Sequence, residues 1–184
     1  MEIANSEQIL KDILNLGADY AKIFNPKDLI FSETIRGYCE ENKCGCYGTN
    51  WMCPPGVGPI SECKKEILEF ENGVVFQTLT KIKGKDDMEG MLKGRDINNN
   101  FLKKVSNFIR EKYKMNKFMP MGAGHCEICK RCAYLENQPC RHPDKAISSA
   151  EAYGVDLGKL LISTGLKFNY SDDTIAYVSL VMWK

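Results

Sequence analysis

The chain has 184 residues and a formal net charge of +1, with 43% hydrophobic and 27% charged residues. This length suits one domain, and this composition can bury a core, which excludes an intrinsically disordered chain. The balanced charge gives no indication of binding to nucleic acid or to an acidic membrane surface. We expect a single domain over residues 1–184.

The first half of the chain carries three helix patterns. Residues 5–18 have one apolar stripe, with Ser6 as a candidate N-cap and Gly17 as a candidate end. Residues 32–42 and 61–73 predict two further helices on either side of a loop rich in cysteine, glycine and proline. The N-terminus has neither the basic region nor the apolar region of a signal peptide, and no stretch approaches the roughly 20 apolar residues of a membrane span. These features favour a cytoplasmic protein.

The second half alternates strands and helices. Residues 74–82 are rich in β-branched side chains and predict a strand, whereas residues 83–96 are polar and predict an exposed connection. Residues 98–114 give the clearest helix pattern, with asparagines available as caps. The segment 117–121 is a short strand candidate.

The C-terminal pattern completes a mixed α/β fold. Residues 156–166 predict a helix capped by Asp156, and residues 174–183 are apolar on both faces, as in a central strand. We therefore expect a small sheet covered by helices, with two cysteine-rich, metal-binding loops at its edge. These loops span residues 39–63 and 124–144.

Nine cysteines are the unusual feature of the composition. In a reducing compartment structural disulfides are rare, and an odd count fits a complete disulfide framework poorly. Five cysteines lie in the upstream loop and four in the downstream loop, with more than 60 residues between the two groups. Metal binding or redox chemistry is the expected role.

The downstream loop contains Cys126, Cys129 and Cys132 at intervals of three residues, followed by Cys140. Iron–sulfur cubanes are held by such closely spaced triplets with a fourth cysteine from a less fixed distance. Structural zinc sites more often use two separated pairs, so the spacing favours [4Fe–4S] over zinc. Cys140 completes the same cluster or reaches across to a second one.

The upstream loop offers Cys39, Cys44 and Cys53 as its basic ligand set. The fourth ligand is Cys46, Cys63 or a group outside the protein. Only one residue separates Cys46 from Cys44, whereas Cys63 begins the next helix pattern, where the helix dipole favours a thiolate. We therefore prefer Cys63 to Cys46, although Cys63 can equally be a small core residue.

Three further residues belong to the expected cluster environment. Trp51 can shield a cluster from water, or it is plain core. Gly124 permits close approach of backbone N–H groups to cluster sulfurs. Arg141 adds positive charge near an anionic cluster, or it belongs to a solvated face.

The stretches "CEENKCGCYGTNWMCPP" and "AGHCEICKRCAYLENQPCRHPDKAISSAEAYGVD" resemble the "predicted metal-binding protein" family, a domain of unknown function of anaerobic bacteria and archaea. The resemblance spans nearly the whole chain and implies iron–sulfur binding, without an agreed reaction. Cys46 lies outside the family pattern, and Cys63 occurs in some relatives only. The pattern covers these cysteines: Cys39, Cys44, Cys53, Cys126, Cys129, Cys132 and Cys140. It also covers Glu151 and Gly154, within a segment that we interpret as a capped helix or as a helix whose N-terminus faces a cluster.

The expected function is that of an iron–sulfur protein with two [4Fe–4S] clusters, transferring single electrons as a redox carrier or subunit. A ferredoxin or a flavoprotein is the expected partner. One alternative is an enzyme whose upstream cluster has an iron open to substrate, and another is a zinc-stapled binding module. The sequence has no nucleotide-binding glycine motif or zinc-protease motif.

Overall fold

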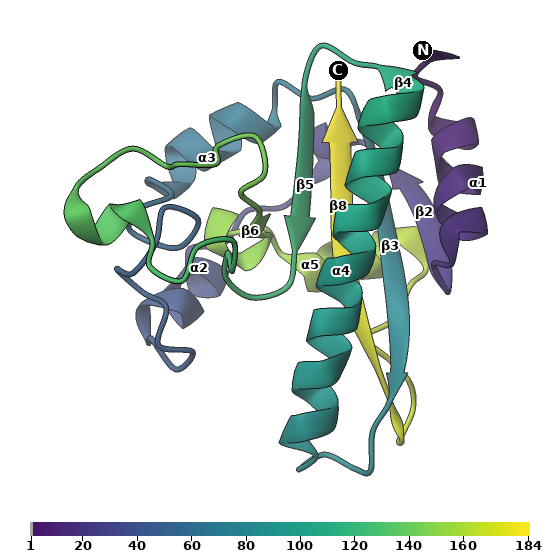
Figure 1. Ribbon diagram of the computed structural model, residues 1–184. Coiled ribbons are helices and arrows are strands. Elements are labelled where there is room, and N and C mark those ends of the chain that lie inside the picture. The colour runs from purple at the N-terminus through teal and green to yellow at the C-terminus, as the bar shows by residue number, and fades with distance from the viewer. Residues whose placement is uncertain (1) are drawn as a thin grey trace.

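A central mixed sheet with helices on both faces forms the body of the computed structural model, which describes residues 2–184 (Figure 1). Neighbouring strands of this sheet are antiparallel, except that β5 and β6 at one edge are parallel. In spatial order the strands are β2 (Tyr20–Phe24), β3 (Asn72–Lys81), β8 (Thr174–Trp183), β5 (Phe118–Gly122) and β6 (Ser148–Ser149). A short strand, β7 (Asn169–Ser171), also pairs with β8, and β1 (Glu2–Ile3) pairs with β4 (Tyr113–Lys114) in a separate parallel pair.

Two hydrophobic clusters cover the two faces of the sheet. Helices α1 (Ser6–Leu16) and α4 (Met88–Lys112) pack on one face, and α3 (Ile60–Ile67) and α5 (Leu157–Thr164) pack on the other. Helix α2 (Glu33–Glu40) lies beside the cysteine loops (Figure 1). Three short 3-10 turns, η1 (Pro26–Asp28), η2 (Ala133–Glu136) and η3 (Glu151–Tyr153), lie in the connections.

Strand β8 has buried side chains on both faces, as its sequence predicts. Val181 and Trp183 belong to the cluster beneath α1 and α4, whereas Leu180 and Met182 belong to the cluster beneath α3 and α5. Successive side chains of a strand point to opposite faces, so a strand covered on both faces is continuously apolar. The mixed α/β fold is therefore confirmed.

The predicted connection over residues 83–96 is wrong, because helix α4 already begins at Met88. The side chain of Asp87 accepts a hydrogen bond from the backbone N–H of Gly90 and caps the helix. The predicted capping role of the asparagines is also wrong at Asn98. This residue is fully buried within the helix, where it binds the side chains of Thr78 and Ser179. In the N-terminal half of α4, hydrogen bonds to the sheet therefore fix the helix where an apolar stripe is missing.

Other boundaries also differ from the sequence prediction. Helix α1 is capped by Asn5 rather than Ser6, and helix α3 ends at Ile67, well before Gly73. The segment expected as a capped helix near Glu151 instead forms strand β6 and turn η3. Strand β2 was not expected from the sequence. Within residues 2–184, no helix combines the length and the apolar composition required to cross a membrane.

Candidate metal centre

The upstream cysteine loop leaves helix α2 and folds back on itself before α3. Cys39 lies in the last turn of α2, and the chain then reverses through Asn42, Gly45 and Gly48, all of which have positive φ angles. Glycine adopts this left-handed backbone without steric cost. The N–H of Gly48 donates to the carbonyl of Pro54 at 2.8 Å, which closes the loop.

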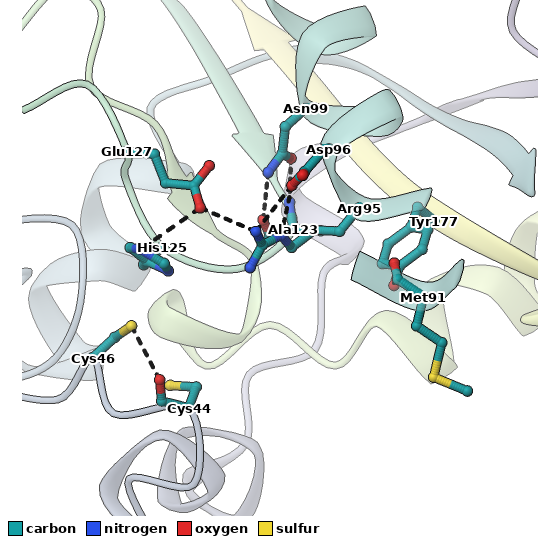
Figure 2. Close-up of polar contacts among 10 residues, drawn as sticks. All are labelled: Cys44, Cys46, Met91, Arg95, Asp96, Asn99, Ala123, His125, Glu127 and Tyr177. Atoms are coloured by element: carbon teal, nitrogen blue, oxygen red, sulfur yellow. Dashed lines mark hydrogen bonds and ion pairs between the residues drawn. The ribbon is translucent and has the colours of Figure 1, made fainter. Parts of the chain in front are cut away.

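Four cysteines of this loop line one cleft with a volume of about 830 Å³. They are Cys39, Cys44, Cys46 and Cys53. Cys46 and Cys53 are buried, Cys39 is half-buried, and Cys44 is exposed at the mouth. The thiol of Cys46 donates to the carbonyl of Cys44 at 3.4 Å (Figure 2).

The protonation of these thiols reflects burial and mutual repulsion. Burial, together with the negative charges of Glu151, Cys53 and Cys44, raises the pKa of Cys39 to about 11. Burial and the neighbouring Cys44 likewise raise the pKa of Cys46 to about 11. Like charges disfavour one another's ionised forms, which adds to the effect of burial. A bound cation would favour the thiolate forms that metal ligation requires.

Cys63 lies outside this group, although the sequence favours it as the fourth ligand. It is 1% exposed and packs in the hydrophobic cluster with Ile67. Its thiol points to the carbonyl of Val57 at 3.6 Å. The structure thus groups Cys46, and not Cys63, with Cys39 and the other cleft cysteines.

Arg36 supplies a buried positive charge beside the cleft cysteines. It is 6% exposed, and its guanidinium donates to the carbonyls of Ala152 and Gly58. Its Nε atom has no hydrogen-bond partner, and none of the ion pairs found among residues 2–184 includes Arg36. A buried charge without a counter-ion is costly. Burial raises the pKa of Cys63 and of Cys39, and the charge of Arg36 opposes this rise at both thiols, so Arg36 lies near both. An anionic iron–sulfur cluster at Cys39, three residues further along α2, fits this charge.

The sequence reasoning did not single out Arg36. Its spacing from Cys39 could have identified it. Residues three apart on a helix share one face, so an arginine three residues before a cysteine ligand lies next to that ligand.

The downstream loop connects β5 to β6 and extends away from the sheet, past α3 (Figure 1). Its cysteines are all half-buried: Cys126, Cys129, Cys132 and Cys140. Burial raises the pKa of Cys53, and the negative charges of Cys44 and Cys126 add to this effect. His125, next to Cys126 in the chain, lines the same cleft as Cys53. The two cysteine loops therefore meet in space.

Trp51 joins the two loops. Its indole Nε1–H donates to the carbonyl of Gln138 at 2.9 Å, and its ring meets the ring of Tyr134 edge to face at 5.0 Å. Trp51 and Cys140 line a second, smaller cavity of about 330 Å³. The Ser148 hydroxyl adds a further tie by donating to the carbonyl of Met52 at 2.6 Å.

Arg141 stabilises the downstream loop from its surface. The guanidinium donates to the carbonyl of Arg131 at 3.0 Å and to the carboxylate of Glu136 at 2.9 Å. Half-exposed pairs of this kind contribute at most about 1 kcal/mol. Arg141 thus acts on loop conformation as well as on local charge.

Gly124 lies where the downstream loop leaves β5 and lines the same cleft as the upstream cysteines. Its φ angle of +81° is left-handed, and a Cβ there would lie 3.3 Å from the Cδ of Arg95. Glu127 pairs with Arg95 at 3.1 Å and lies 3.7 Å from His125 (Figure 2). This network ties α4 to the first residues of the downstream loop.

No three Cys, His, Asp or Glu side chains of residues 2–184 converge closely enough to hold a single metal ion in this conformation. Four cysteines nevertheless line one cleft. A zinc ion needs four ligands around one centre, whereas each cysteine of a cubane binds a different iron. The four sulfur donors that line the cleft match the ligand number of a cubane.

Comparison with known families gives a match over residues 22–183 to the family described as "Predicted metal-binding protein (DUF2284)". The chain belongs to this family. No curated protein matches the chain. Among solved structures, it resembles a crystal structure of epoxyqueuosine reductase with an epoxyqueuosine-modified tRNA-Tyr stem loop, at 9% identity and a TM-score of 0.39. The match covers 95% of this chain but only 44% of the reductase chain.

Proposed function

We propose that this member of the predicted metal-binding family carries two [4Fe–4S] clusters and transfers single electrons. The upstream ligands are Cys39, Cys44, Cys46 and Cys53, with Cys46 replacing Cys63 in the set expected from sequence. The downstream ligands are Cys126, Cys129, Cys132 and Cys140. The observation that carries the proposal is the cysteine wall of the cleft, with the unpaired charge of Arg36 beside it.

The contact between the two cysteine groups supports electron transfer along the chain. Cys53 and Cys126 are within electrostatic reach of each other, and Trp51 holds the two loops together. The downstream loop is the more exposed of the two, so it is the site where a redox partner such as a ferredoxin or a flavoprotein would dock. Bound clusters of this type supply reversible one-electron chemistry.

A second candidate function is that of an iron–sulfur enzyme with its substrate beside the upstream cysteines. The cleft continues past the cysteines along η3 and β8, with Glu151 and Val178 among its lining residues. Clefts of this size, mostly apolar with a few polar groups, are typical of small-molecule sites. An electron carrier has no need of such a cavity.

Anaerobic purification with iron and sulfide analysis and EPR spectroscopy tests the proposal. A brown protein with about eight irons per chain and two EPR signals on reduction is the expected result. A colourless protein with stoichiometric zinc would reject the iron–sulfur assignment in favour of a zinc-stapled module.

A further inference from the structure

Strand β8 has an uncovered edge inside the cleft. Strand β5 pairs with β8 from Phe118 opposite Trp183 to Met121 opposite Leu180, where the pairing ends. Strand β7 pairs with β8 only at its start, at Thr174 and Ile175. Among the strands of residues 2–184, none covers this edge of β8 in between.

Asn99 explains why the pairing of β5 with β8 ends. Its side-chain amide donates to the carbonyl of Ala123 at 2.8 Å and accepts from the N–H of Ala123 at 3.1 Å (Figure 2). In the register of the ladder, Ala123 is the residue that would lie opposite Val178. Because Asn99 occupies both backbone groups of Ala123, the ladder does not continue to Val178.

The backbone N–H and C=O groups of Val178 therefore face the cleft. Ala176 and Lys184 donate their N–H groups on this side of β8, to the carbonyls of Phe168 and Lys117. The backbone groups of alternate residues in a strand point to the same side, so Val178 shares this direction. Neither group of Val178 has a hydrogen-bond partner on this side among the described residues. Buried backbone groups are otherwise almost always paired.

The lysine and arginine side chains that line the cleft are already paired with carboxylates. Arg95 is paired with Asp96 at 2.9 Å and with Glu127 at 3.1 Å. Lys43 is paired with Glu41 at 2.5 Å. No lysine or arginine among the lining residues is left for a phosphate or a carboxylate, within the part of the chain that the structure describes.

The wall next to Val178 is apolar. Ala176 and Leu157 are buried there, and Phe168 is 45% exposed and offers the face or edge of its ring. An aromatic side chain at a cavity wall favours stacking with a flat ligand. An extended peptide that adds to a sheet needs several residues with free backbone groups along the edge. In the described part of this edge only the backbone groups of Val178 are free, which suits a small ring better.

We propose that the cleft binds an uncharged, planar heterocycle with an N–H donor next to a carbonyl acceptor, as in a cyclic amide. The ring edge hydrogen-bonds to the backbone of Val178, and its face lies against the apolar wall beside the upstream cysteines. This inference rests on the second candidate function, the iron–sulfur enzyme, and deepens it by naming the substrate class of its cleft.

Calorimetry on the iron-loaded, full-length protein under anaerobic conditions tests the proposal with three small probes. They are 2-quinolinone, which has the cyclic amide edge, 2-methoxyquinoline, which lacks the N–H donor, and quinoline-2-carboxylate, which is anionic. We expect 2-quinolinone to bind about tenfold or more tightly than either analogue, because each of them leaves backbone groups unpaired. Equal binding of the three probes, or no binding of 2-quinolinone, would overturn the proposal.

Iron content is measured on the same samples, so a failure of iron–sulfur binding and a failure of ligand binding are separate outcomes. Asn99→Leu removes the amide that holds Ala123 away from β8, and we expect it to weaken 2-quinolinone binding about tenfold or more. Asn107→Leu is the matched control, because Asn107 is exposed on the same helix. An iron-loaded Asn99→Leu protein with unchanged 2-quinolinone affinity would contradict the proposed cause of the open edge. If that variant does not fold, the comparison of the three probes on the unmodified protein decides the proposal.

Discussion

The two cysteine loops differ in how the fold encloses them. The upstream loop buries Cys46 and Cys53, closes on itself through backbone hydrogen bonds and faces an 830 Å³ cleft. The downstream loop leaves all its cysteines half-buried, and contacts of its own Arg141 with Arg131 and Glu136 hold it together. We therefore propose different tasks for these two cysteine-rich loops: the enclosed one would hold a reacting group, and the exposed one would contact a partner protein.

Charge compensation differs in the same way. Beside the upstream loop the positive charge of Arg36 is buried and has no acidic partner among the described residues, whereas downstream Arg131 and Arg141 pair with Glu136 near the surface. Buried charges act over longer range than exposed ones, because water does not screen them. We therefore expect local charge to control the upstream cluster more strongly.

The largest expected effect is the loss of one cluster at a time. Cys53→Ser should remove the upstream EPR signal, and Cys129→Ser should remove the downstream signal. Each variant should lose about half of the roughly eight irons. Iron analysis with EPR on both variants measures this. Loss of both signals in Cys129→Ser would show instead that the clusters share ligands or depend on each other.

The fourth upstream ligand is tested by a matched pair of alanine variants. Cys46→Ala should lose the upstream iron. Cys63→Ala should keep the iron and lower the free energy of unfolding by about 1–2 kcal/mol, because it leaves a small cavity in the core. Iron counting and denaturant unfolding separate the two effects. If Cys63→Ala loses a cluster while Cys46→Ala keeps it, the original preference for Cys63 is right.

Replacing Arg36 tests the buried charge. Arg36→Met should lower the midpoint potential of the upstream cluster, because reduction adds negative charge that the arginine no longer compensates. Arg36→Lys should restore part of the shift. The matched control is Arg141→Met, where solvent screening predicts a much smaller change in the downstream potential. Equal shifts in an EPR-monitored redox titration would contradict the difference between the loops.

The connection between the loops is tested at Trp51. Trp51→Phe removes the hydrogen bond to Gln138 and should lower the free energy of unfolding by about 1 kcal/mol. Tyr134→Phe keeps the ring contact and serves as a control with little expected change. Thermal unfolding of the iron-loaded proteins measures both. An unaffected Trp51→Phe protein would mean that the loops hold together without this contact.

The smallest effect concerns pH and the metal-free protein. The pKa of Cys39 is raised from 9.0 to about 11 in the fold, so between these values the folded thiol keeps a proton that the unfolded chain has lost. Folding stability should therefore be fully present below pH 9 and should fall as the pH rises towards 11. Cys39→Ala should reduce this dependence in denaturant titrations of the metal-free chain. The same pH slope in both proteins would show that Cys39 does not cause it.

The periodicity of the sequence was sufficient for the elements with a clear apolar pattern. The alternating and continuous apolar runs predicted β3 and β8, and the apolar stripes predicted α1, α5 and the C-terminal half of α4. The N-terminal half of α4 could not be predicted in this way, because its buried positions include Gly94 and Asn98. Asn98 is stabilised there only by Thr78 and Ser179, which are distant in the sequence.

For the candidate site, the sequence by itself determined that cysteines gather in two loops, because ligand spacing is a local property of the chain. Only the tertiary structure decided which cysteines share a cleft. Cys63 is directed into the core by the face of α3 on which it lies, and a loop reversal closed between Gly48 and Pro54 brings Cys46 and Cys53 to the same cleft. The open edge at Val178 depends on Asn99 from another element, and such long-range hydrogen bonds leave no periodic pattern in the sequence.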